Sequence, residues 1–330
     1  MNIFAPPKLR QGDHIRIISP SSSVASIGGF DANVSAKVRL ESMGYTVSFS
    51  NNYLANDEFG SASITERVDD LHQAFTDLSV KAILASIGGF NSNELLPHLD
   101  YELIKANPKI ICGYSDTTAI LTAIFAKTGM ITYMGASYSS FKMNELQEYQ
   151  SVMWTQALTQ SRYELTPSDK WSSDLWFLPE CTRQFFDTQW HVYTEGQASG
   201  RLIGGNLSTF CLLNGTPYAP RVDMIGDYVM MLEMAEGYDV MDFARQLTAV
   251  LQAYPNPKAV LFGRIPTNVG MTDDLLRAIF DKHPILGRVP VVYDMDFAHT
   301  QPLFTVGIGS NVVVDTGRHG TGGIKVMVSE

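Results

Sequence analysis

The stretch from Lys109 to Ala126 (KIICGYSDTTAILTAIFA) has a layout that can present a nucleophilic serine. The apolar residues 110–112 predict a short buried strand, and the apolar residues 119–126 predict a helix. Ser115 lies in the tight turn between them, as in a nucleophile elbow. Such a turn lifts the hydroxyl clear of the sheet, and the unpaired N–H groups at the helix start can stabilise a developing oxyanion.

The elbow motif is incomplete, because G-x-S-x-G requires glycine where this chain has Thr117. A simpler interpretation is that Ser115, Asp116 and Thr117 only cap the following helix. This segment alone leaves both interpretations open.

A pair of glycines, Gly88 and Gly89, follows the predicted buried strand at 80–86. Because glycine has no side chain, the backbone N–H groups here can approach a ligand closely. They would suit one half of an oxyanion hole, with the N–H of Asp116 as the other half, although a tight turn explains the pair equally well. Neither GxxxxGK[ST] nor GxGxxG is present, so the pair is not a phosphate loop.

A serine nucleophile needs a base, and the base needs a group that orients it. Among the seven histidines, His299 is distinguished because it follows a strand-to-loop transition. Glu233 ends the predicted strand 228–233. Two catalytic groups at strand ends of one domain can converge on a nucleophile presented by the other domain. Sequence spacing alone does not show that Glu233 and His299 are such groups, since a lone histidine is usually structural.

Strands and helices alternate from residue 14 to the elbow, which predicts a doubly wound, mostly parallel sheet of the Rossmann or flavodoxin type. The predicted strands lie at 14–19, 45–48, 80–86 and 110–112, and the predicted helices at 36–43 and 64–78. In the helix 64–78, Ser63 and Glu66 have the spacing of a capping box. Further strand and helix patterns follow at 131–134 and 144–159.

The second half has its own alternating pattern, which predicts a smaller α/β domain with a mixed sheet. A glycine-rich, hairpin-like stretch at 196–203 opens it. Predicted strands follow at 228–233, 259–263, 289–293, 306–308 and 311–315, with helices at 239–253 and 275–281. We expect an N-terminal domain at 1–161, a linker and substrate-facing loop at 162–195, and a C-terminal domain at 196–330. The middle segment is polar, aromatic and weakly periodic.

The composition limits the partners that the protein can have. The formal net charge of −10 argues against a nucleic-acid polymer or an anionic membrane, although a single nucleotide can still bind in a local pocket. The three cysteines lie far apart without a CxxC pattern, which indicates a reducing cytoplasm and no structural zinc. The N-terminus lacks the apolar core of a signal peptide, and no stretch reaches membrane-spanning length.

Five motifs, in order along nearly the whole chain, resemble those of the LD-carboxypeptidase family of serine peptidases, and most closely its microcin C self-immunity branch. They are SIGGFNSNELLPHLDY (86–101), NPKIICGYSDTTAI (107–120), GRLIGGNLSTF (200–210), MLEMAEG (231–237) and AHTQPLFTVGIG (298–309). The resemblance implies a Ser-Glu-His triad at the junction of two domains, with no metal and no organic cofactor. Ser115 matches the nucleophile, His299 the catalytic histidine and Glu233 the glutamate, while Gly89 and Asp116 match the oxyanion-hole residues.

The resemblance also suggests substrate-binding roles and a homodimer. Gly88, Asn206 and Trp176 are the expected substrate contacts, with Trp176 stacking on a nucleobase and Trp171 as the second candidate. Two positions depart from the family pattern. Ser86-Ile87 stands where murein-directed members usually have an Arg before the paired glycines, and Met234 follows Glu233 where an acidic residue is common. Glu236 is therefore the alternative candidate for the role of Glu233.

Three functions follow as hypotheses. The first is a peptidase that cleaves peptidyl- or aminoacyl-nucleotide amides, as in microcin C self-immunity. The second is a murein LD-carboxypeptidase that trims tetrapeptides during cell-wall recycling. The third is a binding protein that kept the cleft and lost catalysis. The departure at Ser86-Ile87 and the aromatic segment favour the first, and the intact Ser, Glu and His disfavour the third.

Overall fold

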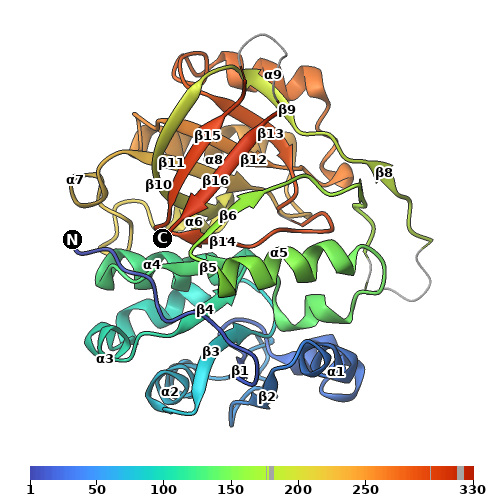
Figure 1. The fold of residues 1–330 in the computed structure, drawn as a ribbon, viewed down its shortest axis with the longest axis vertical. Helices are drawn as coiled ribbons and strands as arrows, with labels where there is room; N and C mark the ends of the chain where they lie inside the picture. Colours follow the sequence, from blue (N-terminus) through green and yellow to red (C-terminus); the bar gives the residue numbers. More distant parts are fainter. Residues whose placement is uncertain (176, 178–181, 298, 318–322) are drawn as a thin grey trace.

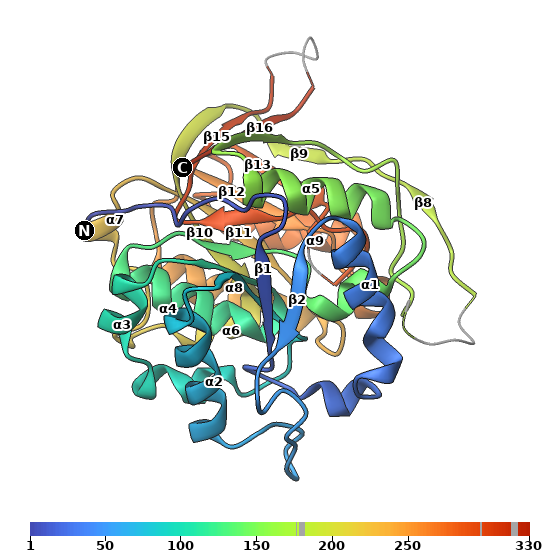
Figure 2. The same cartoon turned by 60° about the horizontal axis from the view of Figure 1, so that its bottom comes forward.

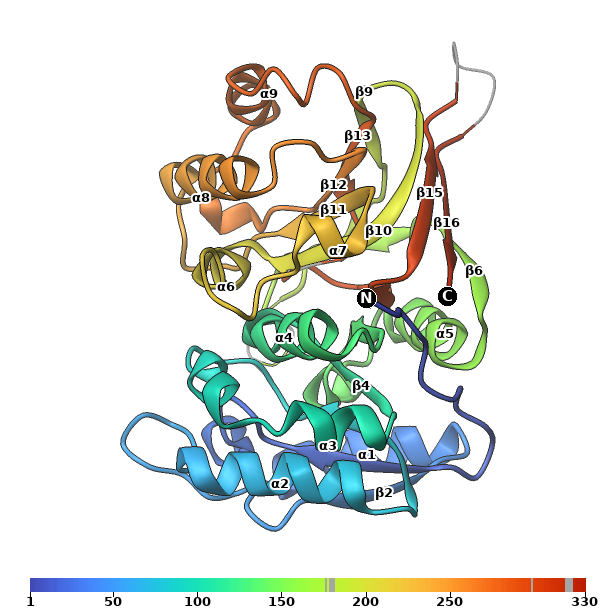
Figure 3. The same ribbon diagram turned by 90° about the vertical axis from the view of Figure 1, so that its left-hand side faces the viewer.

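The structure is a computed structural model that describes residues 1–175, 177, 182–297, 299–317 and 323–330. It contains two main sheets, one in each half of the chain, and the helix α4 lies between them (Figures 1 and 3). Buried apolar residues of α4 and of the C-terminal strands belong to one continuous core. The two halves therefore share apolar packing as well as facing each other.

The N-terminal sheet has the order β2-β1-β3-β4-β5-β14, and all its pairs are parallel except the last. Its strands are β1 (His14–Ile18), β2 (Thr46–Phe49), β3 (Val80–Ala85), β4 (Ile110–Gly113), β5 (Thr132–Met134) and β14 (Val306–Ile308). Its helices are α1 (Val34–Ser42), α2 (Ile64–Thr76), α3 (Tyr101–Ala106), α4 (Thr118–Thr128) and α5 (Gln147–Thr159). The order of the first five strands is that of a flavodoxin-like doubly wound fold, so the predicted fold class is confirmed.

Local sequence explains how the individual helices form. The predicted capping box of α2 is present, because Ser63 Oγ accepts from the N–H of Glu66 and the Glu66 side chain accepts from the N–H of Ser63. Helix α4 is buried almost all round because it lies between the two sheets, which accounts for its nearly continuous apolar sequence. Short 3-10 helices occupy Val24–Ile27, Asp31–Asn33, Ser92–His98, Ser115–Thr117, Tyr138–Lys142 and Thr267–Val269.

The C-terminal sheet has the order β6-β16-β15-β10-β11-β12-β13-β9, with a parallel centre and antiparallel flanks, which confirms the predicted mixed sheet. Its strands are β6 (Arg162–Leu165), β9 (His191–Thr194), β10 (Gln197–Asn206), β11 (Tyr228–Glu233), β12 (Ala259–Gly263), β13 (Val291–Met295), β15 (Asn311–Asp315) and β16 (Lys325–Ser329). The helices are α6 (Leu207–Leu212), α7 (Val222–Ile225), α8 (Val240–Ala253) and α9 (Asp273–Asp281), and α6, α8 and α9 line one side of the sheet in Figure 3. A separate small ribbon pairs β7 (Lys170–Trp171) with β8 (Phe186–Asp187), and β8 lies at the rim of the molecule in Figure 2.

Three segments differ from the sequence-based expectation. The strand at 306–308 was expected in the C-terminal sheet, but as β14 it pairs with β5 at the edge of the N-terminal sheet. The segment 162–195 contributes β6 and β9, the two edge strands of the C-terminal sheet. The hairpin-like stretch at 196–203 is part of the ten-residue strand β10. Apolar periodicity predicts a strand but not its partner, which explains the first difference, and the weak periodicity of 162–195 explains why β6 and β9 were not predicted.

Two glycines at the end of β10 permit close packing. A Cβ atom at Gly204 would lie 2.1 Å from the carbonyl oxygen of Met231, and one at Gly205 would lie 2.6 Å from the Thr118 side chain. Both glycines also have positive φ angles. They let the end of β10 lie directly on β11 and on α4. Among the described residues, no helix is both long and apolar enough to cross a membrane.

Candidate active site

A cavity of about 610 Å³ lies where the carboxyl ends of strands from both sheets meet. The N-terminal half contributes the segments that follow β1, β3 and β4, three neighbouring parallel strands. The C-terminal half contributes the segments that follow β10 and β11. The carboxyl edge near a topological switch point is where doubly wound sheets bind ligands. The cavity is therefore the candidate active site.

Ser115 lies at the cavity wall with a strained backbone. Its φ angle is +60°, in the left-handed region that residues with a side chain rarely adopt. A Cβ atom on Gly88 would lie only 2.8 Å from Ser115 Cβ and 2.9 Å from its Oγ. Gly88 thus leaves room for the serine side chain. A strained turn between β4 and α4 is the geometry of a nucleophile elbow, even though Thr117 replaces its usual glycine.

His299 connects Ser115 with Glu233. Its Nε2 lies 2.9 Å from Ser115 Oγ, and its Nδ1 lies 2.9 Å from Glu233 Oε2. A carboxylate only accepts hydrogen bonds, so Nδ1 carries the proton and donates to Glu233. The lone pair of Nε2 then faces the serine hydroxyl. The structure thus brings together three side chains that are far apart in the sequence, at 115, 233 and 299.

Glu233 is held in turn by Asn206, its cross-strand neighbour on β10. The Asn206 side-chain amide donates to Glu233 Oε1 at 2.9 Å, while its Oδ1 caps α6 by accepting from the N–H of Thr209. Its backbone N–H donates to Thr118 of α4. Asn206 also lines the cavity, where a substrate contact is expected of it. Its bond to Glu233 could not be predicted from local sequence patterns, because the two residues are 27 positions apart.

The electrostatic surroundings raise the pKa of His299. Burial disfavours the imidazolium, but the charge and hydrogen bond of Glu233, together with the charge of Glu236, outweigh it and raise the pKa of His299 above its ordinary 6.5. The ring of Tyr114 lies 5.4 Å from the imidazole, and burial raises the pKa of this phenol to about 12, so it stays neutral. Glu233 itself is almost completely buried.

Comparison with known proteins identifies the family. The LD-carboxypeptidase N-terminal domain model matches residues 15–135, and the LD-carboxypeptidase C-terminal domain model matches residues 199–314. The putative carboxypeptidase YocD of Bacillus subtilis (strain 168) is 40% identical over 312 residues, which cover 93% of this chain and 95% of that protein. The chain belongs to the LD-carboxypeptidase family. It is therefore a serine peptidase, as the sequence motifs predicted.

Relatives of this chain within the LD-carboxypeptidase family include a microcin self-immunity protein and a murein peptide carboxypeptidase. The microcin C7 self-immunity protein MccF of Escherichia coli is 30% identical over 273 residues, 78% of each chain. The probable murein peptide carboxypeptidase of Bacillus subtilis is 26% identical over 332 residues, 99% of this chain and 96% of that protein. The crystal structure of an MccF-like protein from Bacillus anthracis has a TM-score of 0.92 at 36% identity and covers 99% of both chains. MccF in complex with aspartyl sulfamoyl adenosine has a TM-score of 0.86 at 26% identity, covering 100% of this chain and 99% of that chain.

In this member of the LD-carboxypeptidase family, the residues expected to form the oxyanion hole line the same cavity as Ser115. Gly89 and Asp116 both line the cavity. A Cβ atom on Gly89 would lie 2.4 Å from Ser22 Oγ and 2.8 Å from its backbone nitrogen, so the loop after β1 can approach only because position 89 is glycine. The carboxylate of Asp116 is buried and accepts from Ser21 Oγ and from the N–H of Ser92. Asp116 therefore ties the nucleophile turn to the loops after β1 and β3.

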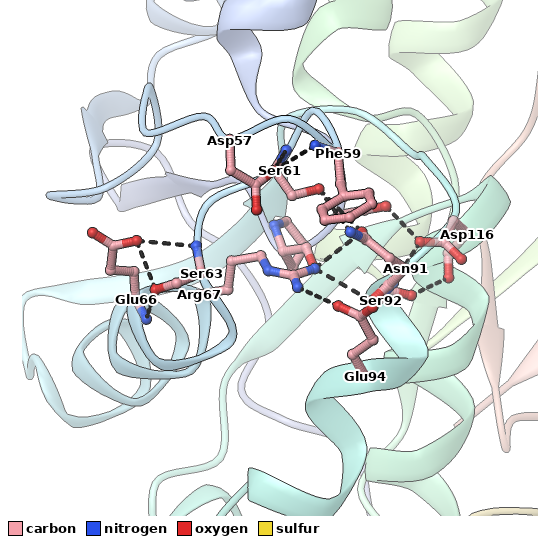
Figure 4. Close-up of polar contacts among 12 residues, drawn as sticks. Asp57, Phe59, Ser61, Ser63, Glu66, Arg67, Asn91, Ser92, Glu94 and Asp116 are labelled. Carbon is pink, nitrogen blue, oxygen red and sulfur yellow. Dashed lines mark hydrogen bonds and ion pairs between the residues drawn. The ribbon is translucent and has the colours of Figure 1, made fainter.

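A second network holds the Gly89 loop from its outer side. The buried Arg67 donates through Nη1 to the side-chain and backbone oxygens of Asn91, at 3.0 and 3.2 Å, and through Nη2 to Glu94 (Figure 4). Ser92 then continues the network to Asp116 (Figure 4). Sequence reasoning missed Arg67, although one signal was present: four residues before Leu71, it lies on the apolar face of α2.

We predict that Arg67→Met lowers kcat about tenfold to a hundredfold, because small displacements of catalytic groups have effects of that size. It also removes the hydrogen bonds that the charged Arg67 donates to Asn91, whose oxygens then keep only Ser61 Oγ and the N–H of Glu94 as donors among the described residues. This loss should cost about 1–3 kcal/mol of stability. The matched control is Glu94→Gln, which removes the ion pair but leaves the bonds between Arg67 and Asn91. Steady-state kinetics and thermal melting separate the two effects. A lower melting temperature with unchanged kcat would give Arg67 a purely structural role.

The loop that carries His299 is anchored by a buried carboxylate, which sequence reasoning also missed. Asp296 is fully buried and pairs with Arg264 at 3.1 Å. It also accepts from Trp190 Nε1 at 2.8 Å, and the guanidinium of Arg264 lies over the ring of Trp171. Trp190 and Trp171 thus contact the Asp296–Arg264 pair that anchors the loop. Trp171 is not among the described residues that line the cavity.

The remaining sequence-based expectations concern the substrate. Trp176, the expected base-stacking residue, lies outside the described residues, and from its segment Phe177 lines the cavity. Gly88 also lines the cavity, where its absence of a side chain makes space for Ser115. Among the described residues, no group of three or more His, Cys, Asp or Glu side chains could hold a metal ion.

Proposed function

We propose that the protein hydrolyses aminoacyl- or peptidyl-nucleotide amides with Ser115, His299 and Glu233 as a catalytic triad. The observation that carries the proposal is the double hydrogen bond of His299, 2.9 Å to Ser115 Oγ and 2.9 Å to Glu233 Oε2. This is the arrangement in which a base activates a serine while a carboxylate fixes the tautomer of the base. It favours a peptidase over a protein that only binds its ligand.

In the proposed mechanism, Ser115 Oγ attacks the acyl carbon while His299 Nε2 takes the hydroxyl proton. The oxyanion accepts hydrogen bonds from the N–H groups of Gly89 and Asp116. The imidazolium gives its proton to the leaving nitrogen, and the acyl group remains on Ser115 as an ester. A water molecule, deprotonated by the same imidazole, then attacks the ester, and the imidazolium returns this proton to Ser115 Oγ as the acid is released.

Support for a nucleotide amide comes from the cavity and the relatives. The cavity volume of about 610 Å³ is in the range that holds a small organic ligand. MccF, which resembles this chain over its full length, has been solved with aspartyl sulfamoyl adenosine. The second candidate is a murein LD-carboxypeptidase, which the similarity to the murein peptide carboxypeptidase of Bacillus subtilis supports. The cytoplasmic location remains a prediction of the cysteine pattern, and the homodimer and the base-stacking role of Trp176 remain predictions of the sequence resemblance.

The experiment that tests the proposal compares two substrates side by side. Aspartyl sulfamoyl adenosine and a murein LD-tetrapeptide are offered to the purified protein, and product formation is followed by mass spectrometry. Higher kcat/KM on the adenosine compound supports the proposal. Higher kcat/KM on the tetrapeptide would instead support the murein function, and hydrolysis of neither would contradict both.

The raised pKa of His299 predicts the pH dependence. A general base must be neutral, so kcat/KM should rise with pH as the imidazolium loses its proton. The midpoint of this acid limb should lie above the ordinary histidine value of 6.5, because the effects of Glu233 and Glu236 outweigh that of burial. A pH profile of kcat/KM reports this pKa in the free enzyme. A midpoint at or below 6.5 would contradict the electrostatic argument.

A further inference from the structure

Glu236 is an acidic group of the active-site cavity that the proposed mechanism does not use. It lines the cavity together with Ser115 and His299. Its Oε2 atom is buried and has no hydrogen-bond partner among the described residues. The other two carboxylates near the triad are occupied, since Glu233 binds His299 and Asn206, and Asp116 binds Ser21 and Ser92.

A buried carboxylate oxygen without a hydrogen-bond partner is unfavourable, and carboxylates in such places usually pair with a cation. Among the described residues that line the cavity, only Arg245 and His299 can carry a positive charge. Arg245 also lines the cavity, but its side chain is 74% exposed and pairs with Asp242 at 2.6 Å. His299 already donates to Glu233, and Glu236 acts on it only through its charge. The unsatisfied oxygen is therefore available to a positively charged ligand group.

The position of Glu236 limits where that ligand group must be. The scissile carbonyl carbon has to lie against Ser115 Oγ, so substituents of the adjacent carbon lie within a few ångströms of the triad. Glu236 is close enough for its charge to influence both His299 and Tyr114, which flank the nucleophile. In an aminoacyl substrate, the cation nearest to the scissile carbonyl is the α-ammonium group.

We infer that Glu236 binds the α-ammonium group of an aminoacyl substrate and so determines specificity for acyl groups with a free amine. The inference rests on the proposed function, because it assumes an aminoacyl compound at Ser115. An N-acylated, peptidyl substrate has a neutral amide in place of the ammonium and loses this ion pair. The protein should therefore prefer aminoacyl-nucleotides to the corresponding peptidyl-nucleotides.

The test compares two ligands that differ only in the amine, aspartyl sulfamoyl adenosine and its succinyl analogue. Both are titrated calorimetrically into the Ser115→Ala variant at about pH 7, where an α-ammonium with a pKa of about 8 is charged. The amine should tighten binding about tenfold to a hundredfold, the usual range for a charge-assisted hydrogen bond. Adding Glu236→Gln should abolish this preference and leave the affinity for the succinyl compound nearly unchanged.

The matched control is Arg245→Gln, which changes a charged residue of the same cavity and should leave the amine preference intact. Equal weakening of both ligands by Glu236→Gln would overturn the inference, as would an amine preference that persists in that variant. Failure of both ligands to bind would overturn it as well. If the amine preference follows Glu236 but the protein with Ser115 intact does not hydrolyse the aspartyl compound, the proposed activity fails and the binding role stands.

Discussion

Replacing Ser115 by alanine should abolish hydrolysis while leaving the fold intact. The hydroxyl is the only group of this side chain that reaches His299 Nε2, at 2.9 Å, and alanine cannot form the acyl intermediate. Loss of a triad nucleophile typically lowers kcat by about 10⁴- to 10⁶-fold. The measurement is kcat on whichever substrate the wild-type protein hydrolyses, with circular dichroism to verify folding.

Ser26→Ala is the matched control for this variant. Ser26 also lines the cavity, but it is exposed and its hydroxyl bonds only to the carbonyl of Ser23. Its replacement should change kcat little. A folded Ser115→Ala protein with near-wild-type kcat would show that the nucleophile is another group.

A second large loss of kcat is expected when Glu233 is replaced by glutamine. In Glu233→Gln, the buried side chain keeps its size but loses the charge that holds the proton on His299 Nδ1, so the lone pair of Nε2 no longer faces the serine. Such a change lowers kcat by about 10⁴-fold in a serine triad. The pKa of His299 should also fall, because Glu233 is the largest contribution that raises it.

A double-mutant cycle shows whether the triad acts as a unit. His299→Ala and Ser115→Ala should each reduce kcat strongly, and the double variant should be no worse than the more damaged single variant. Losses that multiply in the double variant would mean that the two residues act independently. Glu233→Gln should likewise cause little further loss of kcat in a protein that already carries Ser115→Ala.

Local patterns were enough to predict the elements that carry the catalytic groups. The apolar run before Ser115 and the helix after it indicated a strand, a turn and a helix, and the structure has β4, a 3-10 turn and α4 there. The strand ending at Glu233 was predicted with its observed bounds. These features are encoded within about ten residues, because strand and helix periodicity depend on near neighbours.

The pairing of elements followed from contacts that sequence periodicity does not contain. Residues 306–308 have the apolar pattern of a buried strand, and that pattern is the same whichever sheet the strand joins. Only the free edge of β5 places it in the N-terminal sheet. The glycine-rich stretch at 196–203 was interpreted as hairpin-like, yet nearly all of it belongs to β10. Gly204 and Gly205, at the end of this strand, permit close contact with Met231 and Thr118, which are distant in sequence.

The sequence by itself determined the family, the two-sheet α/β class and the candidate residues Ser115, Glu233 and His299. The tertiary structure decided how these residues meet, because the carboxyl ends of β4, β10 and β11 converge on one cavity. It also decided which polar groups are satisfied: Asn206 holds Glu233, whereas Glu236 lines the cavity and has a buried oxygen without a hydrogen-bond partner among the described residues. Burial and hydrogen-bond partners arise from long-range packing, and for that reason the role of Glu236 became visible only in the folded protein.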